Sequence, residues 1–171
     1  MKKGKFLAMA ILSISLGACS SDDDSNNNNS GAIAGTYDLT EFNTGAATDF
    51  NEDGTESTNQ MDESNCYDDR KISFNSDNTF TYEIDYILID TNTGVAVCAQ
   101  NDVTGTWTAS NNTITVTYEQ EDGTDVTLNF ARSNNGNTLT QTTVLTTYPD
   151  RDGDGVPFNR AGSVELVFDK R

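Results

Sequence analysis

The chain has 171 residues, of which 10 are basic and 27 acidic, so its formal net charge is −17 at pH 7. A surface this acidic repels phosphate backbones, which argues against nucleic acid as a partner. The sequence contains no histidine. The usual general base, the usual zinc ligand and histidine-activated nucleophiles are therefore missing, and we expect no enzymatic activity.

Residues 1–18 are predicted to form a signal peptide. Three lysines precede an apolar run from 6 to 16, which is too short to span a bilayer as a helix but suits the core of a secretory signal. The run ends in Leu-Gly-Ala-Cys, which looks like a bacterial lipoprotein signal with Cys19 as the acylated residue. The alternative is an ordinary secretory signal followed by a chance cysteine. Lipidation would attach the protein to a membrane, and we expect the outer membrane.

Residues 19–34 are predicted to be a disordered tether. The tract from Ser20 to Gly31 has no large apolar residue, so it has nothing to bury in a core. Its acidic run, Asp22 to Asp24, resembles the surface-export tethers of lipoproteins from the Bacteroidota and indicates the cell surface, although a plain soluble spacer would have the same composition. The remaining residues, 35–171, are enough for one domain with one core.

The domain is dominated by strand signals, in which apolar residues alternate with polar ones. The predicted strands lie at 35–39, 71–74, 78–86, 103–107, 112–119, 124–131, 137–148 and 163–168. Short turns such as Glu121–Gly123 join neighbouring strands, and no segment has helical periodicity over a useful length. We therefore predict an all-β fold, a single antiparallel up-and-down β-barrel of about eight strands, with a sandwich as the alternative.

Five aromatic residues are expected to point into the barrel: Tyr37, Phe80, Tyr82, Trp107 and Tyr118. An aromatic inward face suits a small apolar or amphipathic ligand, and we predict these residues as its site. The alternative is that they simply fill the core. An additional apolar stretch at 87–97 is either an added hairpin or a further strand, which leaves the strand count open.

Cys66 and Cys98 are the two cysteines that remain after Cys19. Outside the cytoplasm, an even pair of cysteines is more often a disulfide than two thiols. We therefore predict a Cys66–Cys98 bond that closes a loop of about 30 residues. The alternative is two buried thiols, and the spacing of the cysteines does not fit a metal site.

Two acidic runs, 49–54 and 150–155, stand in connections that the strand pattern leaves long, at about 43–68 and 148–161. Oxygen-bearing side chains at alternate positions with a glycine at the bend are typical of calcium loops, so we predict a Ca²⁺ site of modest affinity in each run. The predicted ligands are Asp49, Asn51, Asp53 and Thr55 in the first run and Asp150, Asp152, Asp154, Val156 and Asn159 in the second. The alternative is a pair of solvated turns.

The placement of the two runs depends on the stretch at 87–97. If this stretch is not a separate strand, strict up-and-down alternation places both runs and both cysteines at the same end of the barrel. If it is a full strand, the runs fall at opposite ends. The predicted disulfide favours the first arrangement, so we expect one decorated end.

Several motifs of the domain are informative together. They are GTY at 35–37, NSDNTFTYE at 75–83, GTWTASNNTITVTYE at 105–119 and VELVFDK at 164–170, with DFNEDGTEST at 49–58 ahead of Cys66. These motifs resemble lipocalin-like lipoproteins of the Bacteroidota over most of 35–171, and the resemblance implies an eight-stranded barrel, often without an assigned ligand. The chain departs from that pattern at 87–97. The run at 150–159 also resembles thrombospondin type 3-like calcium repeats, but it has Phe158 where those carry a further acid.

Two functions are compatible with these features. The first is a lipid-anchored binding module that holds a small apolar or amphipathic ligand in the barrel, with loops stiffened by Ca²⁺. The second is a structural or interaction lipoprotein with a filled barrel, which contacts surface proteins or glycans through its acidic loops; the sequence identifies no such partner. A carboxylate glycosidase is a weaker third possibility. Such an enzyme needs two carboxyl groups about 5 to 9 Å apart in a cleft, and the sequence shows no pair of acids set among apolar residues. A cavity would separate the first function from the second.

Overall fold

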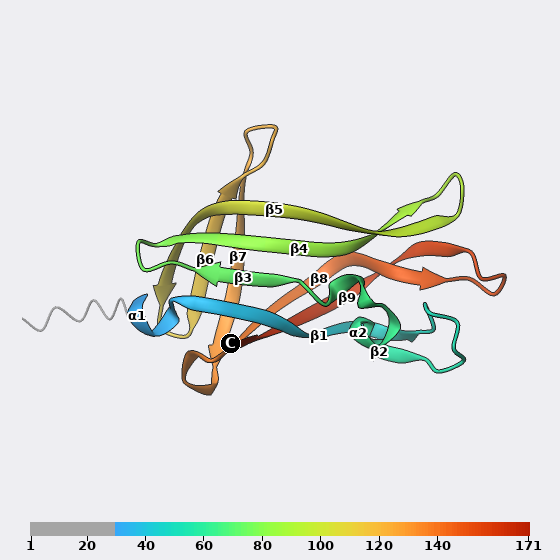
Figure 1. Ribbon diagram of the computed structural model, residues 1–171, viewed down its shortest axis with the longest axis horizontal. Helices are drawn as coiled ribbons and strands as arrows, with labels where there is room; N and C mark the ends of the chain where they lie inside the picture. Colours follow the sequence, from blue (N-terminus) through green and yellow to red (C-terminus); the bar gives the residue numbers. More distant parts are fainter. Residues whose placement is uncertain (1–29) are drawn as a thin grey trace, which may run out of the picture.

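The computed structural model describes residues 30–171, and they fold almost entirely into antiparallel strands (Figure 1). The elements, in chain order, are α1 (Ser30–Ile33), β1 (Gly35–Thr48), β2 (Ser57–Asn59), α2 (Gln60–Glu63), the 3-10 helix η1 (Asn65–Tyr67), β3 (Lys71–Phe74), β4 (Thr79–Asp90), β5 (Val95–Ser110), β6 (Thr113–Glu119), β7 (Asp125–Ser133), the 3-10 helix η2 (Asn134–Gly136), β8 (Thr138–Arg151) and β9 (Pro157–Lys170). Each of the eight predicted strands is present, and several are longer than the sequence pattern indicates.

Eight of these strands close a barrel, which confirms the predicted fold. β1 and β3 to β9 pair in chain order, and β1 also pairs with β9, from Tyr37↔Lys170 to Thr44↔Val164. The short strand β2 pairs only with the far half of β1. β5 and β6 approach closely at Gly105, where a Cβ atom would clash with the carbonyl oxygen of Thr117.

One end of the barrel, the closed end, is covered by α1. Ile33 is fully buried in the core, and the Tyr37 hydroxyl lies 3.0 Å from the carbonyl oxygen of Ile33 and 2.9 Å from that of Gly136. Residues 30–34 therefore belong to the barrel domain, and the tether predicted to extend to residue 34 is too long. Cys19 and the predicted signal peptide lie outside the described residues.

Three connections meet at the opposite end, the mouth end. They are the loop at 49–56 after β1, the β4–β5 tip at 91–94 and the β8–β9 tip at 152–156; Figure 1 shows all three on the right and α1 on the left. Arg151 Nε donates to the carbonyl oxygen of Phe50 at 2.7 Å, which joins the first and third connections. A Cβ atom at Gly94 would lie 3.7 Å from Val156 Cγ1, so the second tip lies beside the third. The expectation of one decorated end is confirmed.

The second acidic run does not occupy a long loop, and this part of the prediction is wrong. β8 continues to Arg151 and β9 begins at Pro157, because residues 146–151 pair with 157–162 in one ladder. Backbone hydrogen bonds do not depend on side-chain polarity, so a run that reads as a turn can still form strand. Only the tip at 152–156 is left as a connection.

The first long connection is also more ordered than predicted. β1 extends to Thr48, and β2, α2 and η1 occupy most of the chain between residues 57 and 67. The Asn59 side chain caps α2 by accepting from Met61 N, and the Ser64 hydroxyl accepts from Cys66 N at the start of η1. These polar side chains satisfy backbone groups that short helices leave free, which allows compact structure without a periodic apolar pattern.

The stretch at 87–97 is not a strand of its own. It forms the outer part of the β4–β5 hairpin, paired from Ile87↔Cys98 to Asp90↔Val95. β3 pairs with β4 only as far as Glu83, so the hairpin projects past β3 towards the mouth end (Figure 1). The barrel therefore keeps eight strands, and both acidic runs lie at one end.

Aromatic side chains fill the interior towards the closed end. Tyr82, Phe130 and Phe168 meet pairwise edge to face, with ring centroids 5.9 to 6.4 Å apart. Phe74 contacts both Tyr37 and Trp107 in the same geometry, at 5.7 and 5.5 Å. Aromatic rings prefer this arrangement because the positive ring edge faces the negative ring face. The cavities at the mouth end and beside the β6–β7 turn are lined by other side chains than these rings.

Candidate functional site

The first acidic run forms a loop whose side chains accept hydrogen bonds from its own backbone. Gly54 N donates to Asp49 Oδ2 at 3.1 Å, and Asp53 N donates to Asn51 Oδ1 at 2.9 Å. Thr55 N donates to Asp53 Oδ1 at 2.8 Å. Such bonds are typical of polar turns, in which Asp and Asn replace missing backbone partners.

The second acidic run is split between a strand and a tip. Asp150 is buried on β8, where its Oδ2 lies 3.0 Å from Arg160 Nε and its Oδ1 accepts from Arg151 N at 2.8 Å. Asp152 Oδ1 accepts from the backbone N–H groups of Asp154 and Val156 at 3.0 and 2.9 Å. Asn159, the last predicted calcium ligand, follows on β9 and lines a different cavity, described below.

The two runs face each other across a cleft of about 470 Å³. The charged residues that line it are Asp49, Glu52, Glu56, Asp150, Arg151, Asp152 and Arg160. Within residues 30–171, no three His, Cys, Asp or Glu side chains are gathered closely enough to hold a metal ion. In this arrangement arginines face some of the acids, such as Arg160 with Asp150. Calcium binding stays a prediction from the sequence.

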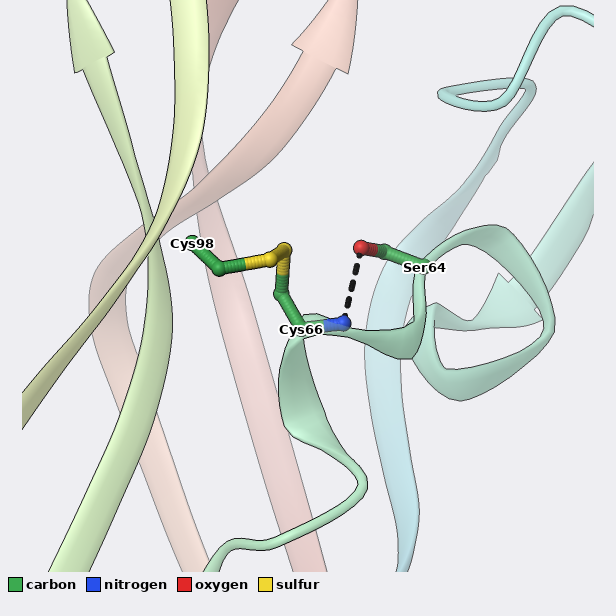
Figure 2. Close-up of a disulfide and its surroundings, with 3 residues drawn as sticks. All are labelled: Ser64, Cys66 and Cys98. Atoms are coloured by element: carbon green, nitrogen blue, oxygen red, sulfur yellow. Dashed lines mark hydrogen bonds between the residues drawn. A yellow bond between two sulfur atoms is a disulfide. The ribbon is translucent and has the colours of Figure 1, made fainter.

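The predicted disulfide is present between Cys66 on η1 and Cys98 on β5 (Figure 2). Cys66 N also donates a hydrogen bond to the Ser64 hydroxyl at 3.1 Å, which caps the start of η1. The bond ties the segment between α2 and β3 to the projecting β4–β5 hairpin. The position of the side chains that follow Cys66 is therefore fixed relative to the barrel.

A second cavity, the mouth cavity, lies inside the barrel below the mouth end and has a volume of about 310 Å³. Its apolar wall consists mainly of Phe42, Ile87, Val164 and Leu166, from β1, β4 and β9. Its polar wall includes Tyr67, Arg70 and Gln141, together with threonines of β8. Apolar side chains beside convergent polar groups are the combination that small-molecule sites use, and in this cavity the two kinds of wall are of similar extent.

Three polar groups of the mouth cavity are incompletely paired. Arg70 donates from Nε and Nη2 to the Tyr82 hydroxyl oxygen, at 3.0 and 2.5 Å. The Tyr67 hydroxyl and Gln141 Oε1 are buried without a hydrogen-bond partner among the described residues. Burial raises the pKa of Tyr67 well above its ordinary value, and the nearby Arg70 cation opposes this shift. The hydroxyl therefore stays protonated at neutral pH and can donate a hydrogen bond.

The aromatic residues predicted as the ligand site lie elsewhere. Tyr37, Phe80, Tyr82 and Trp107 are buried in the core, and none of them lines the mouth cavity. Tyr118 is half-buried and lines a separate cleft beside the β6–β7 turn. The prediction that these rings face inward is right for the four buried residues, and the core-filling alternative describes their role.

Sequence reasoning missed the residues that form the polar wall. Tyr67 and Arg70 come from the connection before β3, where no alternating pattern gives the direction of a side chain. Gln141 lies on β8, whose run of threonines hides which face is buried. The one available signal was Cys66, because a predicted disulfide places its sequence neighbours against the barrel wall.

One family model matches more than half of the chain. It is described as "Lipocalin-like domain" and covers residues 33–150, from the end of α1 to the last but one residue of β8. Among curated proteins, none matches the chain. No helix within residues 30–171 is both long enough and apolar enough to cross a bilayer.

Proposed function

Since the chain belongs to the lipocalin-like domain family, we propose that it binds a small apolar or amphipathic ligand in its mouth cavity. The lipocalin-like barrel suggests binding of a small ligand, and the mouth cavity is the observation that carries the proposal. Core aromatics fill one half of the barrel, while the other half keeps about 310 Å³ of space. This volume is at the lower end of the range for small-molecule sites, about 300 to 1,000 Å³.

The β4–β5 hairpin supports an apolar component in the ligand. Leu88, Val95 and Val97 are each about half exposed, at 52, 52 and 50%. They lie on the same face of the hairpin as Tyr82 and Val103, because residues two apart on a strand share a face. On the opposite face of the hairpin, Ile87 and Ile89 are buried and Ile87 lines the cavity, so the hairpin contributes an apolar side chain to the cavity wall. Leu88, Val95 and Val97 form a separate exposed apolar patch on the other face.

A filled barrel would favour the alternative of a structural or interaction protein. The cavity favours binding instead, and the absence of histidine from the whole sequence favours a non-catalytic role. We also propose, from the sequence, that lipidation at Cys19 anchors the protein to the outer membrane. The described chain enters at the closed end, so an anchor placed before it would leave the mouth free to receive a ligand.

Filling the mouth cavity is expected to weaken the binding of a neutral apolar probe. Thr143 lines the cavity from β8 and is exposed enough to accept a larger side chain. In Thr143→Trp, the indole ring would occupy space that the probe needs, and affinity for N-phenyl-1-naphthylamine should fall by about tenfold or more. Fluorescence titration of the purified protein measures this affinity directly.

The matched control is Thr127→Trp, which places the same ring on the exposed surface of β7. This variant should bind the probe as the parent does. Equal affinity of the parent and Thr143→Trp would place the probe outside the mouth cavity. A parent that shows no saturable binding of the probe would count against the proposed function.

Lipidation and calcium binding can be tested together by intact mass spectrometry. Protein isolated from its native membrane should begin at Cys19 and carry acyl chains, because the thiol is the attachment point in the predicted signal. Calcium at millimolar concentration should add the mass of one or two ions, which chelation removes. A chain that begins at another residue, or a mass unchanged by calcium, would contradict the corresponding prediction.

A further inference from the structure

Arg70 is a half-buried cation without a carboxylate partner. Arg151, Arg160 and Arg171 each lie within 4.0 Å of an acidic side chain. Among residues 30–171, the ion pairs do not include Arg70, although the chain has 27 acids. Its guanidinium donates only to Tyr82, and Nη1 has no acceptor within hydrogen-bond distance in the described part of the chain. A cation in the wall of a cavity with no counter-ion is unfavourable unless something else supplies negative charge.

Other hydrogen-bond donors line the same cavity. The Tyr67 side chain is 1% exposed, and its hydroxyl has no partner among the described residues. Gln141 adds an amide whose nitrogen can donate and whose buried Oε1, an acceptor, has no partner among the described residues. The described polar wall of the cavity therefore offers a guanidinium, a phenol and an amide, and it contains no carboxylate. The Tyr67 hydroxyl, a donor buried without an acceptor, indicates a ligand that brings an acceptor with it.

We propose that the mouth cavity takes an amphipathic ligand with an anionic head group, a carboxylate or a phosphate, and that Arg70 and Tyr67 contact this head group. The inference rests on the proposed function and specifies its ligand class. A planar guanidinium matches two oxygens of a carboxylate or phosphate at once, and such charge-assisted bonds are stronger than neutral ones. The Tyr82 hydroxyl, which accepts from Nε and Nη2, holds Arg70 in place for this contact.

The negative charge of the protein favours amphipathic anions over small hydrophilic ones as ligands of this cavity. With a net charge of −17, the protein repels free anions from its surface, so a small hydrophilic anion gains little by approaching it. An amphiphile has a second source of affinity, because its chain can contact the apolar side chains of Ile87 and Leu166 in the cavity. We therefore expect binding to need both the anionic head and the apolar chain.

The test compares three ligands that share a ten-carbon chain: decanoate, decyl phosphate and decan-1-ol, each below its aggregation limit. Titration calorimetry on the purified protein should show at least one anion binding about tenfold or more tightly than the alcohol, as expected for hydrogen bonds to a charged group. The preferred anion identifies the head group as carboxylate or phosphate.

Arg70→Gln should remove the preference for the anions over decan-1-ol, and Tyr67→Phe should reduce that preference. Arg70→Lys, which keeps the charge, should retain part of it. Arg132→Gln is the matched control, because Arg132 is another half-buried arginine without an ion pair and lies on β7, outside the mouth cavity. Thermal unfolding of each variant verifies that it is folded.

The outcomes separate the two levels of the proposal. Equal affinities for all three ligands would overturn the anionic head group and leave the proposed binding function intact. An anion preference that survives in Arg70→Gln would overturn the role of Arg70. Failure of all three ligands to bind the parent, together with failure of the neutral probe, would overturn the proposed function itself.

Discussion

Replacing both Cys66 and Cys98 with serine is expected to lower the free energy of unfolding by about 3 to 4 kcal/mol. The two cysteines are 32 residues apart in sequence, and loss of the bond gives the unfolded chain the freedom of a loop of that length. The folded state also loses its covalent link between η1 and β5. Urea denaturation of the double variant and the parent, under the same oxidising conditions, measures the difference.

Two controls separate the bond from the chemistry of the substitution. Reducing the parent with dithiothreitol should give nearly the same loss as the double variant. Ser64→Ala removes only the hydroxyl that accepts from Cys66 N, and it should cost about 1 kcal/mol. A loss below about 1 kcal/mol in the double variant would mean that the bond does not restrict the unfolded chain in the expected way.

The same double variant should also bind the neutral probe more weakly. Tyr67 directly follows Cys66, and Arg70 lies four residues after Cys66, so the bond helps to fix both side chains of the polar wall. Without it, the segment before β3 samples more conformations, and part of the binding free energy is spent on ordering it. The effect on binding is thus coupled to the effect on stability.

Phe168→Ala is expected to destabilise the barrel by about 3 to 5 kcal/mol. Phe168 is fully buried on β9, and its ring meets those of Tyr82 and Phe130 edge to face. Truncation removes both contacts and leaves a cavity that the rigid strands of a closed barrel cannot collapse to fill. The measurement is again the urea midpoint and slope, which together give the free energy of unfolding.

A graded series makes this prediction specific to the ring. Phe168→Leu keeps most of the volume and should cost less than the alanine variant. Leu145→Ala on β8 alters a side chain that is 91% exposed, and it should change stability by no more than about 0.5 kcal/mol. A Phe168→Ala variant as stable as Leu145→Ala would show that the aromatic cluster does not support the fold.

The strands of this protein could be predicted because their apolar residues alternate. On β6 and β7, Ile114 pairs with Phe130 and Val116 with Leu128, as expected when two strands bury the same face. The turn at Glu121–Gly123 between them could be predicted as well, because Asp-Gly is a typical hairpin turn. The disulfide was also predictable, because only two cysteines remain after Cys19 and an even pair outside the cytoplasm usually forms a disulfide.

The ends of the strands were harder to predict, because they lie where the local pattern is polar. The run at 150–155 has the composition of a turn, yet Asp150 lies in a strand. Its backbone pairs with β9, and its carboxylate forms an ion pair with Arg160 on that strand. The run at 43–48 is rich in small residues, yet it extends β1 because β9 and β2 pair with it. Pairing partners far away in sequence therefore override local composition.

The amino-acid pattern was enough to predict the barrel and the disulfide, because they follow from alternation, turn chemistry and an even number of cysteines after Cys19. The strand count was decided by the structure, in which residues 87–97 extend the β4–β5 hairpin. The proposed binding site needed three-dimensional information, because its parts come from separate elements: Tyr67 and Arg70 before β3, Ile87 on β4 and Gln141 on β8. None of these residues has a distinctive local context in the sequence. Barrel closure and the Cys66–Cys98 bond bring them around one cavity, and whether space remains between packed side chains depends on the whole fold.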